Sequence, residues 1–360
     1  MPRLGDYVKI KTGKLDANAS SENGQYPFFT CSVEPLKIDT YSYDCECVLV
    51  AGNGDLNVKY YNGKFDAYQR TYIIESKDKK ILSVPYLYCF LDGYVEELRK
   101  QSIGGVIKYI KLGNLTEAQI PMCSITEQNE IVENLNKVNT LITLRKQQLS
   151  KLDELVKSRF VELFGDGQYP KVALIDLIKD GAGLSYGIVQ PGDDGTGDMG
   201  VLRPVDMVDG KISTASIKYI DRSIGDGFKK TELTGDELLI TVRGTTGITA
   251  LTDSRFVGMN VTRGIAVVRY DRNKIDPVYL NAYLNTQESQ RYIQEHTRGA
   301  TLQQINLSDL RIHQIMLPPT ALQRQLAALV EQTDKSKLAI QKSLEKLEIL
   351  KKAVMQKYFG

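Results

Sequence analysis

The stretch "EQNEIVENLNKVNTLITLRKQQLSKLDELVKSRFVELF" fills residues 127–164 and contains neither proline nor glycine. Apolar side chains recur along it at alternating spacings of four and three residues, which predicts one side of a long α-helix. Ser124 or Thr126 can cap the start of this helix. An apolar stripe with this period favours burial against a second helix. The stripe consists of Ile131, Leu135, Val138, Ile142, Arg145, Leu149, Leu152, Val156, Arg159 and Leu163.

The end of the chain repeats this pattern in residues 320–360, after a start marked by Pro318 and Pro319. Two such helices most simply pack on each other in antiparallel orientation; the alternative is that each packs on its own globular domain. A helix of about 39 residues would be roughly 58 Å long. The second stripe consists of Leu326, Val330, Thr333, Lys337, Ile340, Leu344, Leu347, Lys351, Val354 and Tyr358. Its lysines, and the arginines of the first stripe, could fix the register, pack along their stems or contact a partner protein.

The two helical stretches belong to an internal repeat. Residues 104–165 align without gaps with residues 299–360, and 14 of the 62 positions are identical. Both segments end in Phe-Gly, at 164–165 and at 359–360. A repeat of this length predicts two copies of one module, residues 1–165 and 166–360.

Upstream of the helices the two copies match more loosely. The similar pairs are "CVLVAGNGD" (47–55) with "ELLITVRGTTG" (237–247), "AYQRTYIIE" (67–75) with "NVTRGIAVV" (260–268), "VPYLYCFL" (84–91) with "DPVYLNAYL" (276–284), and "MPRL" (1–4) with "YPKV" (169–172). Short apolar and β-branched runs broken by Gly, Asn and Asp predict a β-rich domain with a few helices. The predicted fold class is α+β, with domains at 1–123 and 166–319 and helical regions at 124–165 and 320–360.

Composition limits the chemistry that this chain can carry. Five cysteines, all in the first third of the sequence, and two distant histidines suggest free, buried thiols in a reducing compartment rather than disulfides or a metal site. No apolar run is long enough for a membrane span, so the cytoplasm is the expected location. The net charge of +2 does not by itself indicate nucleic-acid binding.

Three short stretches have a weak similarity to catalytic motifs. Gly52-x-Gly54 lacks the strand–helix context of a nucleotide site, and "LPPT" (317–320) lacks the polar residue of a methyltransferase motif. Asp66 with Glu75 and Lys77 resembles nuclease carboxylates, but a solvated strand end is the simpler interpretation. We therefore expect no catalysis in this chain and no cofactor on it.

Over essentially its whole length the chain resembles the specificity (S) subunits of type I restriction-modification systems. The matching segments are "PRLGDYVKIKTGK" (2–14), "YPFFT" (26–30), "VAGNGDLNVKYYNGKFDAYQRTYII" (50–74), "SIGGVIKYIKLGNLTEAQIPMCSITEQNEIV" (102–132) and "TRGATLQQINLSDLRIHQIMLPPTALQRQLAALV" (297–330). The first copy departs from the family pattern, with Cys123-Ser124 where Pro318-Pro319 align.

The resemblance implies two β-rich target-recognition domains, separated by two long antiparallel coiled-coil helices and related by a pseudo-twofold axis. It also implies a non-catalytic subunit that reads a bipartite, asymmetric sequence in double-stranded DNA. The implied partners are two adenine-N6 methyltransferase (M) subunits and, through the complex, restriction (R) subunits. S-adenosylmethionine, ATP and Mg²⁺ are expected only on those partners.

Base reading requires Arg, Lys, Asn or Gln on exposed loops, and Gly lets the backbone approach a phosphate. Clusters of such residues occur at Gly-containing loops in both copies. The predicted DNA-binding residues are Asn53, Asn57, Lys59, Tyr60, Lys64, Gln69, Arg70 and Lys108 in the first domain, and Arg243, Thr245, Thr246, Asn260, Arg263, Arg298, Thr301, Gln303 and Gln304 in the second.

Other functions remain open at this point. A duplicated coiled-coil scaffold for protein partners would touch no DNA, whereas a DNA-binding chain would lose affinity steeply with salt. A free-standing nuclease or methyltransferase is opposed by the missing motifs. The recognition chain of a related bipartite system, whose partner fuses nuclease and methyltransferase, is compatible with the same residues.

Overall fold

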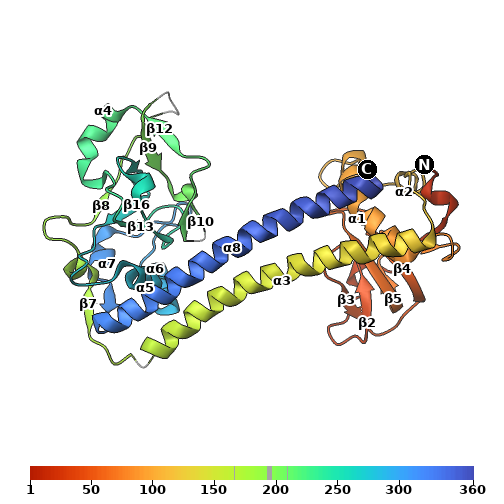
Figure 1. Cartoon of the computed structure of the whole chain (residues 1–360), viewed down its shortest axis with the longest axis horizontal. Coiled ribbons are helices and arrows are strands. Elements are labelled where there is room, and N and C mark those ends of the chain that lie inside the picture. The colour runs from red at the N-terminus through yellow and green to blue at the C-terminus, as the bar shows by residue number, and fades with distance from the viewer. Residues whose placement is uncertain (166, 193–196, 209) are drawn as a thin grey trace. The chain divides into compact units, whose positions relative to one another are not determined.

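The computed structural model describes residues 1–165, 167–192, 197–208 and 210–360. The chain packs into two compact units, unit 1 with Met1–Gln148 and Ile340–Gly360, and unit 2 with Leu149–Ala339. Two continuous 40-residue helices, α3 (Ile125–Phe164) and α8 (Thr320–Phe359), each contribute residues to both units (Figure 1). The expected mixed α+β class with long helices is confirmed. The expected boundary at residue 166 lies outside the described residues.

Unit 1 contains one six-stranded sheet in the order β1-β6-β4-β5-β2-β3. Neighbouring strands are antiparallel except β2 and β5, which are parallel. The elements are η1 (Leu4–Asp6), β1 (Val8–Thr12), η2 (Ala17–Ala19), β2 (Tyr26–Phe29), β3 (Leu36–Ile38), β4 (Tyr43–Ala51), β5 (Val58–Ala67), β6 (Thr71–Ser76), α1 (Val84–Gln101) and α2 (Leu112–Thr116).

Alternation along β4 gives the sheet of unit 1 two apolar faces, because successive side chains of a strand point in opposite directions. Val48 and Val50 lie in one core together with Leu87 and Leu91 of α1. Cys47 and Leu49, which alternate with them along β4, form a second cluster on the other face, with Phe65 and Ile73. The sheet therefore carries α1 on one face, and the apolar cluster on its other face, which includes Phe29 of β2, is built from its own strands.

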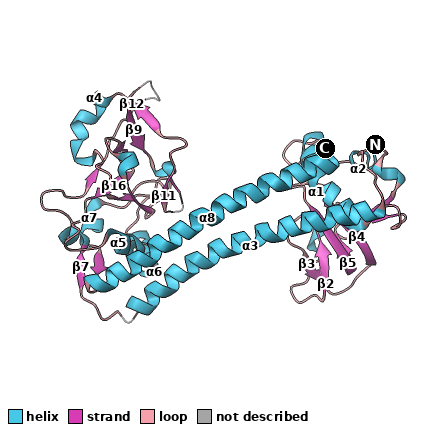
Figure 2. Ribbon diagram, viewed as in Figure 1, coloured by secondary structure: helices cyan, strands magenta, loops and turns pink. Residues whose placement is uncertain are grey.

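Unit 2 is built from shorter strands (Figure 2). Its sheets have the orders β14-β13-β16-β8, β12-β9-β15, β10-β11 and β17-β7, and β15 pairs with β9 in parallel. The elements are β7 (Lys171–Ala173), η3 (Leu174–Leu177), β8 (Ser185–Tyr186), β9 (Met199–Leu202), η4 (Pro204–Asp206), β10 (Met207–Val208), β11 (Lys211–Ile212), β12 (Lys218–Ile220), α4 (Arg222–Gly225), η5 (Asp226–Thr231), β13 (Leu238–Thr241), β14 (Thr249–Leu251), η6 (Ser254–Phe256), β15 (Asn260–Val261), β16 (Ile265–Val268), α5 (Pro277–Leu284), α6 (Gln287–Glu295), α7 (Leu307–Ile312) and β17 (Gln314–Met316).

The two long helices share a core within each unit. In unit 1, Ile131 and Leu135 of α3 belong to the same cluster as Val354 and Tyr358 of α8. In unit 2, Phe160 and Phe164 of α3 pack in one cluster with Leu326 and Val330 of α8. Every residue of the two predicted stripes is buried or half-buried.

The charged residues on the stripes have partners inside each unit. The ammonium of Lys337 lies 2.6 Å from the Asp153 carboxylate of the facing helix, and Lys351 lies 3.7 Å from Asp92 of α1. Arg159 pairs with Glu162 along its own helix. Together with the Phe160–Val330 cluster, the Asp153–Lys337 pair makes α3 and α8 antiparallel within unit 2, and it supports a role for Lys337 in fixing the register.

Each long helix begins with a buried glutamine in its first turn. The Gln128 side chain accepts a hydrogen bond from the Ser83 N–H (2.9 Å) and donates to the carbonyls of Ile81 (2.8 Å) and Cys123 (3.0 Å). Gln323 accepts from the Asp276 N–H (2.8 Å) and donates to the Pro318 carbonyl (2.8 Å).

Ser83 and Asp276 are the N-caps of α1 and α5, so each glutamine ties the start of a long helix to the start of a helix in the β-rich part of its unit. Ser124, one of the two expected caps, does cap α3: its hydroxyl accepts from the Glu127 N–H, and Glu127 accepts from the Ser124 N–H.

We expect Gln128→Ala to destabilise unit 1 by about 1–3 kcal/mol, because it removes three hydrogen bonds of a buried amide and leaves part-buried backbone groups of Ser83, Ile81 and Cys123 without that partner. Urea unfolding followed by circular dichroism measures this. Asn129→Ala, one residue further along the same turn and exposed, is the matched control and should change stability by less than about 0.5 kcal/mol. Equal effects of the two substitutions would contradict the assignment.

Candidate nucleic-acid interface

Three backbone segments meet in unit 1 at the end of β4. They are the loop 52–57 between β4 and β5, the turn 68–70 before β6, and the hairpin 103–109 after α1; we call this meeting point junction 1. The Ile110 N–H donates to the Gly52 carbonyl (2.9 Å), the Gly54 N–H to the Lys108 carbonyl (2.9 Å), and the Gly52 N–H to the Arg70 carbonyl (2.8 Å). The loop of junction 1 is therefore held by two main-chain bonds to the hairpin side and one to the turn.

Unit 2 contains the same set of bonds, at what we call junction 2: the loop 242–247, the turn 262–264 and the hairpin 298–304. The Ile305 N–H donates to the Val242 carbonyl (3.0 Å), the Gly244 N–H to the Gln303 carbonyl (2.9 Å), and the Val242 N–H to the Gly264 carbonyl (2.8 Å). The two junctions thus have equivalent backbones, whereas their side chains differ.

A glycine closes the hairpin of each junction. Gly104 has φ +115° and Gly299 has φ +102°, in the region that side-chain-bearing residues rarely adopt. A Cβ on Gly104 would lie 2.5 Å from the Ile107 carbonyl oxygen, and one on Gly299 would lie 2.3 Å from the Leu302 carbonyl oxygen. Both the backbone angle and the space therefore require glycine at these two positions.

The structure gathers several of the predicted residues at junction 1. Asn53 and Lys108 lie on segments that contact each other directly, and Arg70 lies in the turn bonded to Gly52. Asn57 donates to the Cys31 carbonyl (2.9 Å) and bonds to the Lys59 ammonium through its side-chain oxygen.

The other predicted residues of unit 1 are less closely gathered. Gln69 is exposed in the same turn and donates to Asp16 (2.7 Å). Tyr60 lies on the sheet face that carries α1, where its ring packs against Tyr88 and its hydroxyl donates to Glu46. Lys64 lies over the Tyr41 ring, five residues further along β5 than Lys59. Tyr60 and Lys64 are therefore not part of junction 1.

Junction 2 brings together Arg243, Arg298, Gln303 and Gln304, which lie on segments bonded to each other. Arg263 is exposed in the turn 262–264. Thr245 and Thr301 are exposed at the tips of the loop and the hairpin. Thr246 is buried, and its hydroxyl is bonded to the Thr297 hydroxyl (2.9 Å). Thr246 therefore supports the loop from within.

Asn260 does not fit the prediction of a DNA contact. Its side chain is fully buried, donates to the Phe228 carbonyl (3.2 Å) and accepts from the Val261 N–H (2.9 Å). Asp66 occupies the equivalent place in unit 1, where it is buried and accepts from the Ala67 N–H (2.9 Å). Both residues lie on strands that pair in parallel with a neighbour, and the side chain of Asn260 bonds only inside the protein, so we assign Asn260 a structural role.

Sequence reasoning missed three residues at junction 1. The Cys31 thiol donates to the Asn53 side-chain oxygen (2.9 Å), and no pattern in the sequence indicated this contact. Ile103 and Tyr109 are exposed; backbone bridges pair Tyr109 with both Ile103 and Asn53. The alignment of Tyr109 with Gln304, and of Ile103 with Arg298, was the available signal.

The junctions carry positive charge that is incompletely neutralised. Burial lowers the pKa of Lys59, although nearby Cys31 and Glu34 oppose this effect. A partly desolvated ammonium favours an anion placed next to it. Within the described residues, no ion pair engages the side chains of Lys108, Arg243 or Arg263. Basic side chains of this kind are suited to phosphate or base contacts.

The motif-like residues have ordinary structural roles. Asp66 is buried and accepts from the Ala67 N–H and the Ser42 hydroxyl. Glu75 pairs with Lys11 (2.9 Å), and the Lys77 ammonium donates to the carbonyls of Gly5 and Asp6. Burial lowers the pKa of His313 to about 4, so its imidazole is neutral at neutral pH, and it stacks on Tyr292 away from solvent.

No three His, Cys, Asp or Glu side chains of the described residues are grouped as metal ligands. All five cysteines are free, but only Cys47 and Cys89 are buried; Cys31, Cys45 and Cys123 are half-buried, which corrects the expectation of five buried thiols. In the described part of the chain, no helix is both long and apolar enough to cross a membrane.

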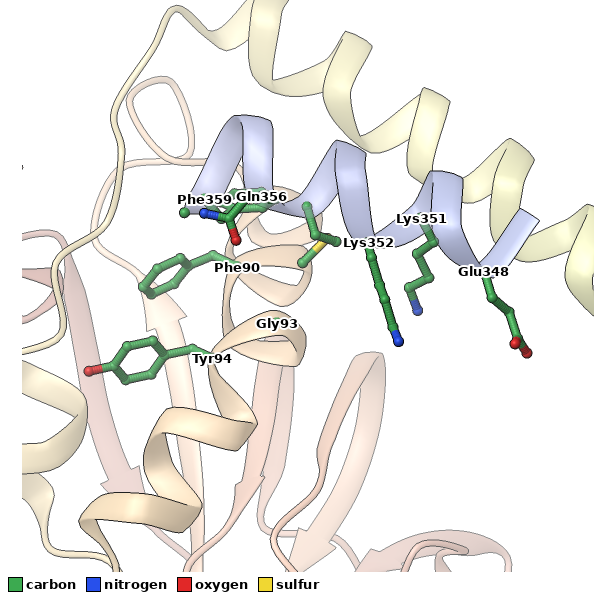
Figure 3. Close-up of a pocket in the computed structure, with 10 residues that line it drawn as sticks. Phe90, Gly93, Tyr94, Glu348, Lys351, Lys352, Gln356 and Phe359 are labelled. Carbon is green, nitrogen blue, oxygen red and sulfur yellow. The ribbon is translucent and has the colours of Figure 1, made fainter. Parts of the chain in front are cut away.

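A hollow of about 620 Å³ lies in unit 1 between α1 and the end of α8. Figure 3 shows Phe90 and Tyr94 projecting from α1, and Lys351, Lys352 and Glu348 along α8. Gly93 leaves room for the Met355 side chain, which a Cβ there would approach to 2.4 Å. The lining is aromatic and aliphatic with charged ends.

Comparisons with known proteins agree with this picture. A family model described as the type I restriction modification DNA specificity domain matches residues 1–154 and 197–351. The specificity subunit of the Escherichia coli type I restriction enzyme EcoDI is 38% identical over 154 residues, covering 43% of this chain and 34% of that protein. The EcoBI specificity subunit of the same organism is 21% identical over 347 residues, covering 87% of this chain and 73% of that protein.

Solved structures match over nearly the whole chain. The S subunit of a type I restriction-modification system from M. genitalium has a TM-score of 0.66 at 15% identity, covering 100% of this chain and 95% of that one. A chain from a study of complex assembly and conformational transition of the type I R-M system has a TM-score of 0.53 at 16% identity, covering 99% and 96%. At these identities the match concerns the fold.

The chain belongs to the family of type I restriction-modification DNA specificity proteins. The predicted resemblance to type I specificity subunits is confirmed at the level of the family by the family model, and the two named relatives are specificity subunits. The aligned part is about a third of the length of the EcoDI subunit, so its partners and DNA target are treated below as proposals.

Two adjacent glycines allow a test of the hairpin in junction 1. We expect Gly104→Ala to destabilise the hairpin by about 1–3 kcal/mol, since alanine would be strained at this φ and would clash with Ile107. Gly105→Ala should be neutral, because its Cβ would meet nothing within 4 Å. Amide hydrogen exchange of residues 103–110 measures the difference, and equal protection in both variants would contradict it.

Proposed function

We propose that this chain reads a bipartite, asymmetric sequence in double-stranded DNA for a type I restriction-modification complex, without catalysing a reaction itself. In this proposal residues 1–123 and 166–319 are the two target-recognition domains. Residues 124–165 and 320–360 are coiled-coil spacers of an internal repeat with pseudo-twofold symmetry. The complex would act in the cytoplasm.

One observation carries this proposal: the two junctions have equivalent backbone bonds but different side chains. A conserved backbone with variable exposed Asn, Arg and Gln is what two related readers of different base sequences require. The side chains that we assign to DNA are Asn53, Asn57, Lys59, Gln69, Arg70 and Lys108 in unit 1, and Arg243, Thr245, Arg263, Arg298, Thr301, Gln303 and Gln304 in unit 2.

The long helices are the proposed binding site for two adenine-N6 methyltransferase subunits, through which restriction subunits join. Within unit 1, large apolar residues of both helices remain exposed: Leu141 and Leu144 of α3, and Ile349 and Leu350 of α8. Exposed apolar side chains on neighbouring helices favour the docking of further helices. S-adenosylmethionine, ATP and Mg²⁺ would belong to those partners, which must extrude the target adenine before methylating it.

The experiment that tests the reading function is methylation mapping. The chain is expressed with its cognate adenine methyltransferase in a host without DNA methylation, and N6-methyladenine is located by single-molecule sequencing. We expect a split motif that disappears when this chain is omitted. Replacing residues 1–123 with those of a relative should change one half of the motif only. An active, correctly paired methyltransferase with no split motif would favour a protein-binding scaffold instead.

The helix proposal has its own test. We expect Leu141→Asp combined with Ile349→Asp to reduce co-purification of the methyltransferase at least about tenfold, because charge is introduced into an apolar contact. Gln147→Asp, at an exposed polar position of α3, is the matched control and should leave co-purification unchanged. If the double variant binds the methyltransferase as the wild type does, the proposal that these apolar residues form the binding site is wrong.

A further inference from the structure

A cross-strand row of side chains crosses each junction. In unit 1, backbone bridges pair Asn53 with Tyr109 and Tyr109 with Ile103, all antiparallel. Residues directly opposite each other on neighbouring strands carry their side chains on the same face. Asn53, Tyr109 and Ile103 therefore stand side by side; we call this set row 1.

Unit 2 has the equivalent row, with different chemistry. Bridges pair Arg243 with Gln304 and Gln304 with Arg298. These three side chains, which we call row 2, stand on one face for the same reason. Arg298 lies 3.7 Å from the Asp309 carboxylate, longer than a close charge-assisted hydrogen bond, so its fork remains available for a ligand.

The chemistry of the two rows matches different bases. The planar fork of arginine fits the O6 and N7 acceptors of guanine, and glutamine or asparagine fits the N6 and N7 edge of adenine. An exposed aliphatic side chain contacts the thymine methyl group. Row 2 therefore suits guanine at two positions with adenine between them, whereas row 1 suits an adenine and a thymine.

The Asn53 side chain of row 1 is also held in place by a neighbouring segment. The Cys31 thiol bonds to the side-chain oxygen of Asn53, and the Cys31 carbonyl accepts from Asn57. Ile103 and Tyr109 are 42% and 36% exposed, so part of each side chain is open to a ligand. The face of row 1 therefore offers apolar area beside the Asn53 amide, which suits a ligand with both polar and apolar edges.

We propose that row 1 and row 2 are the base-reading elements of the two domains, and that the half-site read by unit 2 contains guanines contacted by Arg243 and Arg298, while the half-site read by unit 1 is rich in A·T pairs. This inference rests on the proposed function. It adds Ile103 and Tyr109 as specificity-determining residues and gives the base composition of each half.

Methylation mapping of the full complex tests the rows. Arg243→Ala and Arg298→Ala should each relax one guanine position of one half-site, with sites that differ there becoming methylated about 10- to 100-fold more. Arg243→Lys should relax the same position, because lysine keeps the charge but lacks the fork. Lys229→Ala, an exposed basic residue of unit 2 outside the row, should leave the motif unchanged.

The reciprocal variants act on the other half. Asn53→Ala and Ile103→Ala should each relax one A·T position in the half-site that the arginine variants leave intact. The unchanged half reports that each variant is folded and assembled. If the wild-type chain gives a split motif and all five row variants give the same motif with every base unchanged, the row assignment is overturned while the proposed function stands. A missing wild-type motif would instead overturn the proposed function.

Discussion

The buried amide in the first turn of each long helix is the constraint on which both units depend. Gln128 and Gln323 each bond to the N-cap of a helix in the β-rich part of the unit and to carbonyls of the segment leading into the long helix. An apolar residue at either position would leave these backbone groups unpaired in the core. The direction in which each long helix leaves its β-rich part is thereby fixed by hydrogen bonds, and the apolar stripe then continues the packing.

In each junction, main-chain atoms hold the structure, whereas exposed side chains are free to contact a ligand. Their backbones are held by hydrogen bonds between main-chain atoms, and by Gly104 and Gly299 in conformations that exclude other residues. Because these main-chain bonds use no side-chain atom, the exposed side chains at positions other than the two glycines can change without loss of the hairpin. Asn53 in one unit and Arg243 in the other occupy equivalent places, so the same scaffold can present either an amide or a guanidinium.

The long helices and the α+β class could be predicted from the sequence, because a stripe of apolar residues over ten turns has few alternative explanations. The site could be predicted only to the level of loops. Sequence similarity aligns Arg70 with Arg263. The equivalent backbone bonds of the two junctions instead make Arg70 the counterpart of Gly264, and Gln69 the counterpart of Arg263. A shift of one residue reverses the direction of a side chain along a strand. The inward direction of Asn260 and the contact of Cys31 with Asn53 depend on such tertiary pairing, which the sequence pattern does not encode locally.

The small net charge of +2 is compatible with DNA recognition because the basic residues differ in whether an acidic residue neutralises them. Many basic residues are paired inside the protein, as Lys337 is with Asp153 and Arg272 with Asp236, and these cannot add to phosphate binding. The unpaired ones at the junctions remain available. An interface with few free cations gains limited affinity from counterion release, so more of its discrimination must come from base edges. The two copies have diverged in the side chains of row 1 and row 2 while keeping equivalent backbones. Each would then read different bases, and the DNA target would be asymmetric for that reason.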